Sequence, residues 1–340
     1  MPSISESYIT DLERDGFIVV QDFFDAELVR KAHDEIDAWY RRDLVERRSR
    51  KLTEALNDGV AGKTILTKPT HLMLDAYGRS PTLDALFEKI LTDPESTRLL
   101  GALAGLNLKL RGYNIKRMTK NPDPRPTLGP SPIPHEWHTD SPFEICIAIY
   151  LDDFSQPDNG TTALMKGSHL FPFCPRWNCL FGPIVPTKTK TGIVQGLTAF
   201  LRFNFFNRLL AKRLRARETG AYGKRGDFYI FINDMWHGRE PNIHGNDHMM
   251  LMVGAFPTEA PFPDSVPTPS AEILDRLPPR LRAAAAQSLP GNSGRDTILH
   301  RMFQHRAKAR FPDLFYLARL ERLVADASTA ASLWFKRRFV

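Results

Sequence analysis

The chain has few cysteines, and their number argues against a fold held together by disulfides. Three are present among 340 residues, two of them in "CPRWNC". An odd set of this size fits a reducing compartment better than a secreted scaffold. A zinc knuckle at Cys174 and Cys179 would need two further ligands, and only His169 is near in the sequence. We therefore interpret the cysteines as ordinary residues.

Long apolar runs are also missing, so the sequence predicts no membrane-spanning segment. The first residues, "MPSISESYITDLERDG", lack both the basic and the apolar stretch of a signal peptide, and we expect a soluble, cytoplasmic protein. No internal repeat is visible, and no recognised nucleic-acid-binding module is present, so we expect no nucleic-acid partner. The net charge of +7 is moderate and lies largely in Arg202 to Arg217 and in the final "FKRRFV".

The hydrophobic content, 42% of the residues, is enough for one large domain or two small ones. Helices are predicted near the two ends of the chain, including a helix, strand, helix succession over 7–42 in which Asp25 caps the second helix. Short strands separated by Gly, Pro and Asn turns are predicted between them, at 107–118, 145–153, 223–238 and 248–256. This order is typical of an all-β barrel with helical additions.

We therefore expect a single domain over 1–340 that is mainly β with flanking helices. Residues 1–106 would form a helical N-terminal support with the first strand. Residues 107–256 would form the barrel strands, with a basic insertion at about 181–224. Residues 257–340 are Pro-rich and then helical.

A polar cluster, "HEWHTD", stands between a loop with six prolines in residues 120–134 and a buried strand. On an extended backbone the i, i+2 spacing of His138 and Asp140 points both side chains to one face. With His237, which ends a later predicted strand, they would complete the two-His, one-carboxylate triad that leaves three positions of Fe(II) open. A polar loop is the competing interpretation, because ten histidines make one H-x-D unsurprising.

A zinc protease is excluded by geometry. In "HEWH" the second histidine, His138, stands three residues after His135 rather than four, and the neighbouring prolines prevent the helix that such a site needs.

Several segments, in this order, resemble the phytanoyl-CoA dioxygenase family of Fe(II)/2-oxoglutarate oxygenases over roughly Tyr8 to Phe256. They are "LERDGFIVVQDFFDAELV", "HTD", "AIYLDDFSQPDNGTTALMKGSH", "GDFYIFINDMWHG" and the "PN" that follows. The resemblance implies that His138, Asp140 and His237 bind iron inside a double-stranded β-helix, a jelly-roll or cupin-like barrel. Relatives that halogenate carry a small residue in place of Asp140, so the carboxylate favours hydroxylation or another oxidation.

Two further motifs match the family without implying catalysis. Asn159 and Gly160 correspond to its "NG" turn, and Gly167, Ser168 and His169 correspond to its "GSH". We interpret these five as turn and packing residues.

One departure concerns the co-substrate. The family usually anchors 2-oxoglutarate with an arginine about eleven residues after the second iron histidine, where this chain has His248. A guanidinium binds a carboxylate through two hydrogen bonds and is always charged, whereas imidazole offers single contacts and titrates near neutrality. The anchor is therefore His248, another cation such as Lys116 or Arg239, or absent.

The basic insertion contains "LTAFLRFNFFNRLLAKRLRARE", with apolar residues on one face of a predicted helix and six basic residues around the rest. A helix docked on the barrel is one interpretation. The other is a lid that recognises an anionic head group or lies on a membrane surface.

These observations predict a non-haem Fe(II) dioxygenase that uses 2-oxoglutarate and O₂ to hydroxylate or otherwise oxidise a C–H bond. The predicted substrate is a small, lipid-like or amphiphilic metabolite, including anionic ones. Two alternatives follow from the missing arginine: a non-catalytic metal- or ligand-binding barrel, and a metal-dependent isomerase or epimerase of the same fold.

Overall fold

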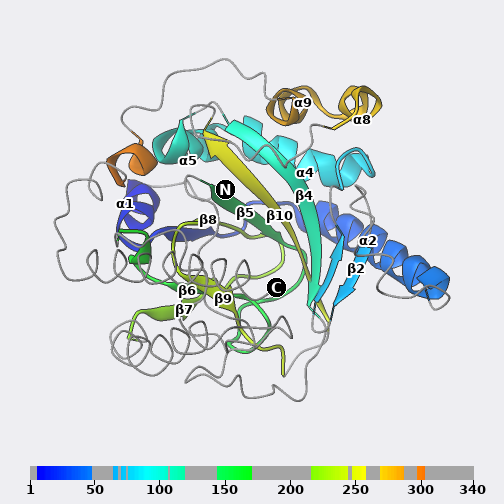
Figure 1. The fold of residues 1–340 in the computed structure, drawn as a ribbon, viewed down its shortest axis with the longest axis horizontal. Helices are drawn as coiled ribbons and strands as arrows, with labels where there is room; N and C mark the ends of the chain where they lie inside the picture. Colours follow the sequence, from blue (N-terminus) through cyan, green and yellow to red (C-terminus); the bar gives the residue numbers. More distant parts are fainter. Residues whose placement is uncertain are drawn as a thin grey trace, which may run out of the picture.

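A computed structural model describes residues 6–47, 64–67, 70–73, 76–105, 108–118, 144–170, 216–243, 247–257, 269–286 and 297–302 (Figure 1). The helices are α1 (Glu6–Asp15), α2 (Ala26–Arg47), α4 (Pro81–Thr92), α5 (Pro94–Ala104), α8 (Ala271–Arg276) and α9 (Pro279–Ala285), with a 3-10 helix η1 (Ser168–Leu170). Within these ranges, no helix is both long enough and apolar enough to span a bilayer.

The strands form two sheets in which every pairing is antiparallel. The large sheet has the order β1-β8-β5-β10-β4-β3-β2 and the small sheet the order β7-β6-β9. Their strands are β1 (Phe17–Val20), β2 (Thr64–Thr67), β3 (Thr70–Met73), β4 (Leu108–Met118), β5 (Ile145–Tyr150), β6 (Thr162–Met165), β7 (Glu218–Gly220), β8 (Phe228–Ile232), β9 (His237–Arg239) and β10 (His248–Pro257). The prediction of a mainly β protein with flanking helices is confirmed.

The predicted helix, strand, helix succession at the beginning of the chain is confirmed. Helix α1 ends before Gly16, whose positive φ of 85° turns the chain into β1. Strand β1 pairs with β8 at the edge of the large sheet. The Asp25 carboxylate accepts hydrogen bonds from the backbone N–H groups of Glu27 and Leu28, which is the predicted cap of α2.

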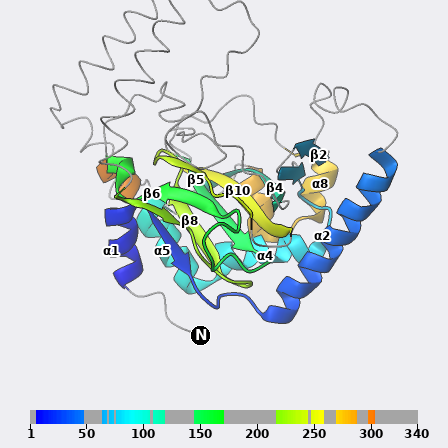
Figure 2. The same cartoon turned by 90° about the horizontal axis from the view of Figure 1, so that it is seen from below.

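The two faces of the large sheet bury different sets of side chains. One face packs against the helices; Figure 2 shows α4 and α5 on this side of the strands. The other face and the small sheet enclose a second cluster, here called the inter-sheet cluster. Because strand side chains alternate between faces, a residue two positions from a cluster member along a regular strand shares its face. The members of the inter-sheet cluster are Met118, Cys146, Ala148, Tyr150, Phe154, Leu164, Ala221, Tyr229, Phe231, Met235, Met250 and Met252.

Two parts of the fold differ from the sequence-based prediction. The hairpin of β2 and β3 extends the large sheet within the segment expected to contain only the first strand. Strand β7 lies inside the segment regarded as a basic insertion and pairs with β6 of the small sheet. Ala216 and Arg217, at the end of the predicted basic helix, form a turn, and the rest of that helix lies outside the described residues.

Candidate metal and co-substrate site

His237 begins β9 and lies buried between the two sheets, opposite Leu164 of β6. Its Nδ1 lies 3.0 Å from the carbonyl oxygen of Met235. Since a carbonyl can only accept, Nδ1 must carry a proton, which leaves Nε2 as the ring nitrogen that can bind a metal. This backbone contact on one ring nitrogen fixes the orientation and tautomer that a metal-binding histidine requires.

The backbone before His237 is held by the "GSH" motif. The Ser168 hydroxyl accepts a hydrogen bond from the backbone N–H of Trp236 (2.8 Å), and the Trp236 carbonyl accepts one from Met165 (3.0 Å). His169 is fully buried, and its Nε2 donates to the carbonyl of Glu13 (3.0 Å). The motif thus fixes the backbone directly before His237 and packs against α1, which agrees with a role in turns and packing.

The "NG" and "PN" motifs meet and join the small sheet to β4. Asn159 and Asn242 form a β-bridge, and Gly160 donates its N–H to the carbonyl of Pro241 (2.9 Å). Gly160 has a φ of 81°, and a Cβ on it would lie 3.2 Å from the Cβ atoms of Asn242 and Met118. Only glycine fits this conformation and this approach without strain.

The other two predicted ligands, His138 and Asp140, lie outside the described residues, as does His135. In the part of the chain that is described, His, Cys, Asp and Glu side chains form no group of three that could hold a metal ion. The backbone N–H of Asn233 donates to the carbonyl of Glu144 (2.9 Å). Glu144 comes four residues after Asp140 and Asn233 four residues before His237, so the chain segments that follow and precede the two motifs are directly hydrogen-bonded.

Two of the three co-substrate candidates lie on the inter-sheet face of the large sheet. Lys116 is two residues before Met118 on β4 and stands beside Met250 of β10.

His248 is two residues before Met250 on β10, with its ring 5.2 Å from that of Phe154. Its Nε2 is a buried atom without a hydrogen-bond partner among the described residues. Burial lowers the pKa of His248, although Asp152, Asp153 and Asp247 oppose the shift.

The third candidate, Arg239, lies on the facing sheet. It is two residues after His237 on β9 and directly opposite Thr162 of β6, so all three side chains share a face. The Thr162 hydroxyl is 2.7 Å from the hydroxyl of Tyr229, a buried member of the inter-sheet cluster. That face is therefore the inner one, and the structure brings the three candidates to the two walls of one interior.

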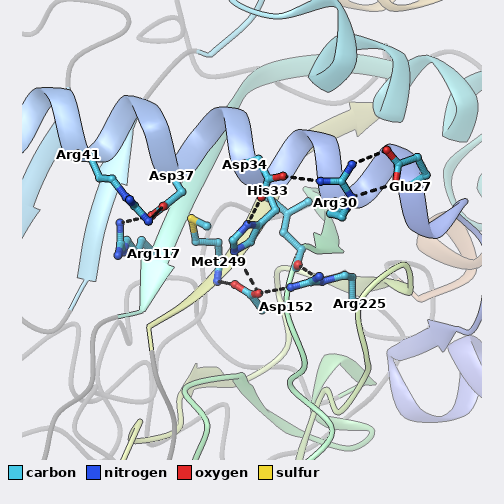
Figure 3. Close-up of polar contacts among 11 residues, drawn as sticks. Glu27, Arg30, His33, Asp34, Asp37, Arg41, Arg117, Asp152, Arg225 and Met249 are labelled. Carbon is cyan, nitrogen blue, oxygen red and sulfur yellow. Dashed lines mark hydrogen bonds and ion pairs between the residues drawn. The ribbon is translucent and has the colours of Figure 1, made fainter.

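A charged network that the sequence did not reveal holds the beginning of β10, next to His248 (Figure 3). The buried Asp152 accepts hydrogen bonds from the backbone N–H of Met249 (2.8 Å) and from Arg225 (2.9 Å). His33 of α2 approaches the same carboxylate at 3.3 Å. Burial alone would raise the pKa of Asp152, but these hydrogen bonds outweigh it and lower the pKa. The only sequence signal was a carboxylate directly after a buried strand.

The ion pair of His33 with Asp152 predicts a pH-dependent stability. The hydrogen bond of His33 to Asp152 raises the pKa of His33, although burial and Arg225 oppose this shift. This stabilisation is therefore complete below the unfolded pKa of about 6.5 and is lost as the pH rises through the raised folded pKa. We expect the melting temperature to fall more from about pH 6 to about pH 8 in the parent protein than in His33→Gln, which cannot titrate. An equal fall in melting temperature for the parent and His33→Gln would show that the ion pair does not contribute to this pH dependence.

The described fold is that of a two-sheet antiparallel protein with one helix-covered face and one buried histidine at the beginning of a small-sheet strand. The chain belongs to the phytanoyl-CoA dioxygenase (PhyH) family, whose model matches residues 12–246. Comparison with curated proteins gave no significant match.

Three solved structures show a similar fold at low sequence identity. HygX from Streptomyces hygroscopicus, with nickel and 2-oxoglutarate bound, is 14% identical, with 75% of this chain and 88% of that one covered and a TM-score of 0.46. The epimerase SnoN, in complex with Fe³⁺, α-ketoglutarate and nogalamycin RO, is 17% identical, with coverage of 79% and 88% and a TM-score of 0.47. AviO1 from Streptomyces viridochromogenes Tue57 is 16% identical, with coverage of 77% and 99% and a TM-score of 0.45.

Proposed function

We propose that this protein is a non-haem Fe(II)- and 2-oxoglutarate-dependent dioxygenase built on a double-stranded β-helix. It would hydroxylate, or otherwise oxidise, a C–H bond of a small or lipid-like metabolite. Membership of the phytanoyl-CoA dioxygenase family supports the enzyme class. The observation that carries the proposal is His237, whose buried ring is held by Met235 in the tautomer that can bind a metal.

The residues fit the implied groups. His237, His138 and Asp140 would supply two imidazole nitrogens and one carboxylate, a donor set that suits Fe(II) and leaves positions for co-substrate and oxygen. Lys116, Arg239 and His248 are the candidates for holding the distal carboxylate of 2-oxoglutarate. Iron with 2-oxoglutarate and O₂ would supply the oxidising power for breaking a C–H bond.

The protein's own contribution would be to position the reactants and to exclude water. The inter-sheet cluster provides apolar and aromatic walls beside His237; the ring of Phe231 lies 5.0 Å from the imidazole, edge to face. Such walls suit an apolar or amphiphilic substrate and keep bulk water from the reacting atoms. The basic segment, residues 197–217, lies almost wholly outside the described residues. Its predicted roles in substrate selection and in contact with a membrane therefore stay predictions.

The experiment that separates an enzyme from a non-catalytic barrel follows 2-oxoglutarate and therefore needs no knowledge of the substrate. Many enzymes of this chemistry consume the co-substrate slowly without substrate, so we expect O₂-dependent release of succinate by the Fe(II)-loaded protein and none by His237→Ala. An epimerase of the same chemistry would consume 2-oxoglutarate too, so this assay does not separate it from a dioxygenase. The product formed from an identified substrate makes that distinction: incorporation of oxygen or loss of hydrogen supports the dioxygenase, whereas inversion without net oxidation supports the isomerase or epimerase. Iron binding without any succinate would favour the non-catalytic barrel.

A further inference from the structure

Arg239 occupies an unusual place for a cation. It lies on the same strand and face as His237, with Thr162 directly opposite, and the Thr162 hydroxyl is bonded to that of Tyr229 from the large sheet. Along a strand, positions i and i+2 are about 6.6 Å apart. A ligand that extends from a metal at His237 along this face would therefore meet the Arg239 side chain.

Arg239 brings a permanent positive charge to this face. The residue is only partly exposed, and the phenol of Tyr229 lies close enough to affect its charge. A guanidinium binds a carboxylate through two parallel N–H···O hydrogen bonds, so a carboxylate that reaches this face matches the geometry of Arg239.

Tyr229 can contribute a second hydrogen bond. Burial raises the pKa of Tyr229, so its hydroxyl keeps its proton at neutral pH. The hydroxyl now contacts the Met250 sulfur at 3.6 Å, a weak acceptor that a carboxylate would replace. When Thr162 donates to the phenol oxygen, the phenol proton is left for that carboxylate.

The other two candidates suit a carboxylate less well. Burial lowers the pKa of His248, so near neutrality this residue offers one neutral N–H rather than a charge. Lys116 is a single point charge on a flexible stem and lacks the paired donor geometry of a guanidinium. Arg239 alone of the three combines a permanent charge, a paired donor geometry and the strand of His237.

We propose that Arg239, assisted by the Tyr229 hydroxyl, anchors the distal carboxylate of 2-oxoglutarate. In this assignment the anchoring cation lies on β9. The position at the beginning of β10, where the family usually has an arginine, is occupied by His248. This assignment depends on the proposed function, and it identifies Thr162 as a positioning residue for the Tyr229 hydroxyl.

The test compares two ligands that differ only at the distal end: 2-oxoglutarate and 2-oxopentanoate, which has a methyl group in place of the distal carboxylate. Their affinities for the Fe(II)-loaded protein are measured without oxygen by calorimetry. We expect the parent protein to prefer 2-oxoglutarate by roughly 100-fold or more, the effect of a buried charge-assisted contact. Arg239→Met should remove this preference and leave 2-oxopentanoate binding within about 3-fold of the parent value.

Conservative variants and matched controls complete the set. Arg239→Lys, which keeps the charge but not the paired geometry, should lose about 10-fold of the preference, and Tyr229→Phe should lose a similar amount. Lys116→Met and His248→Gln should keep it. Iron content and thermal melts of each variant identify any that misfold, in which case Arg239→Lys and Tyr229→Phe carry the test.

The two proposals fail in different ways. If the Fe(II)-loaded parent protein binds neither ligand, the proposed function itself is wrong. If the parent prefers 2-oxoglutarate and the preference survives Arg239→Met but disappears in His248→Gln or Lys116→Met, the function stands and the assignment of Arg239 is overturned.

Discussion

Replacing His237 by Ala is expected to abolish tight Fe(II) binding while the protein stays folded. The imidazole is one of three proposed protein ligands, and its loss should weaken iron affinity by well over about 100-fold, more than the loss of a supporting residue does. His237 is not part of the large helix-side core, so we expect the fold to survive. Anaerobic Fe(II) titration by calorimetry measures the affinity, and circular dichroism with a thermal melt verifies the fold.

The same loss is expected for His138→Ala and Asp140→Ala, because each removes one of the other proposed ligands. His135→Ala is the matched control from the same "HEWHTD" cluster, and its effect should be mild. If His135→Ala weakened iron binding as much as His138→Ala does, the ligand assignment would be wrong.

Replacing Asp152 by Ala is expected to be the most destabilising change among the polar residues near β10. The substitution would leave the Met249 N–H without its acceptor and remove the shared partner of His33 and Arg225. Loss of one partner of a fully buried ion pair costs about 3–5 kcal/mol, and both cations here are partly solvated, so we expect about 2–4 kcal/mol. Urea unfolding of the parent and variant measures the difference.

Asp153 provides the control for this prediction. It is the next residue, carries the same charge, and is exposed, with its carboxylate accepting from the backbone of Ser155 (2.8 Å). Asp153→Ala should therefore change the free energy of unfolding by less than about 1 kcal/mol. Equal effects at the two positions would mean that the network around Asp152 does not stabilise the fold.

Much of the large sheet could be predicted from the sequence, because its strands carry strong local signals. The run "ICIAIY" is apolar without alternation, and all six residues of β5 are indeed buried, since helices cover one face and the small sheet the other. The cap at Asp25 was similarly predictable, because it depends on residues only two and three positions away.

Features that depend on distant partners could not be predicted in this way. The inward direction of Arg239 is decided by its pairing with Thr162, far earlier in the chain, and β9 has only three residues from which to judge alternation. The role of Asp152 likewise depends on His33 and Met249, which belong to elements far apart in the sequence. The short strands of the β2–β3 hairpin, "TILT" and "THLM", lack the length that makes a strand pattern stand out.

The most direct test of the central claim is an anaerobic titration of the protein with Fe(II) and then 2-oxoglutarate, followed by visible absorption. A site in which His138, Asp140 and His237 hold the iron, with positions left for 2-oxoglutarate, should develop the weak charge-transfer band of the iron chelate at an equimolar ratio of the two ligands to protein. The band should be absent in His237→Ala under the same conditions. No band with the parent protein, or an undiminished band with His237→Ala, would contradict the account.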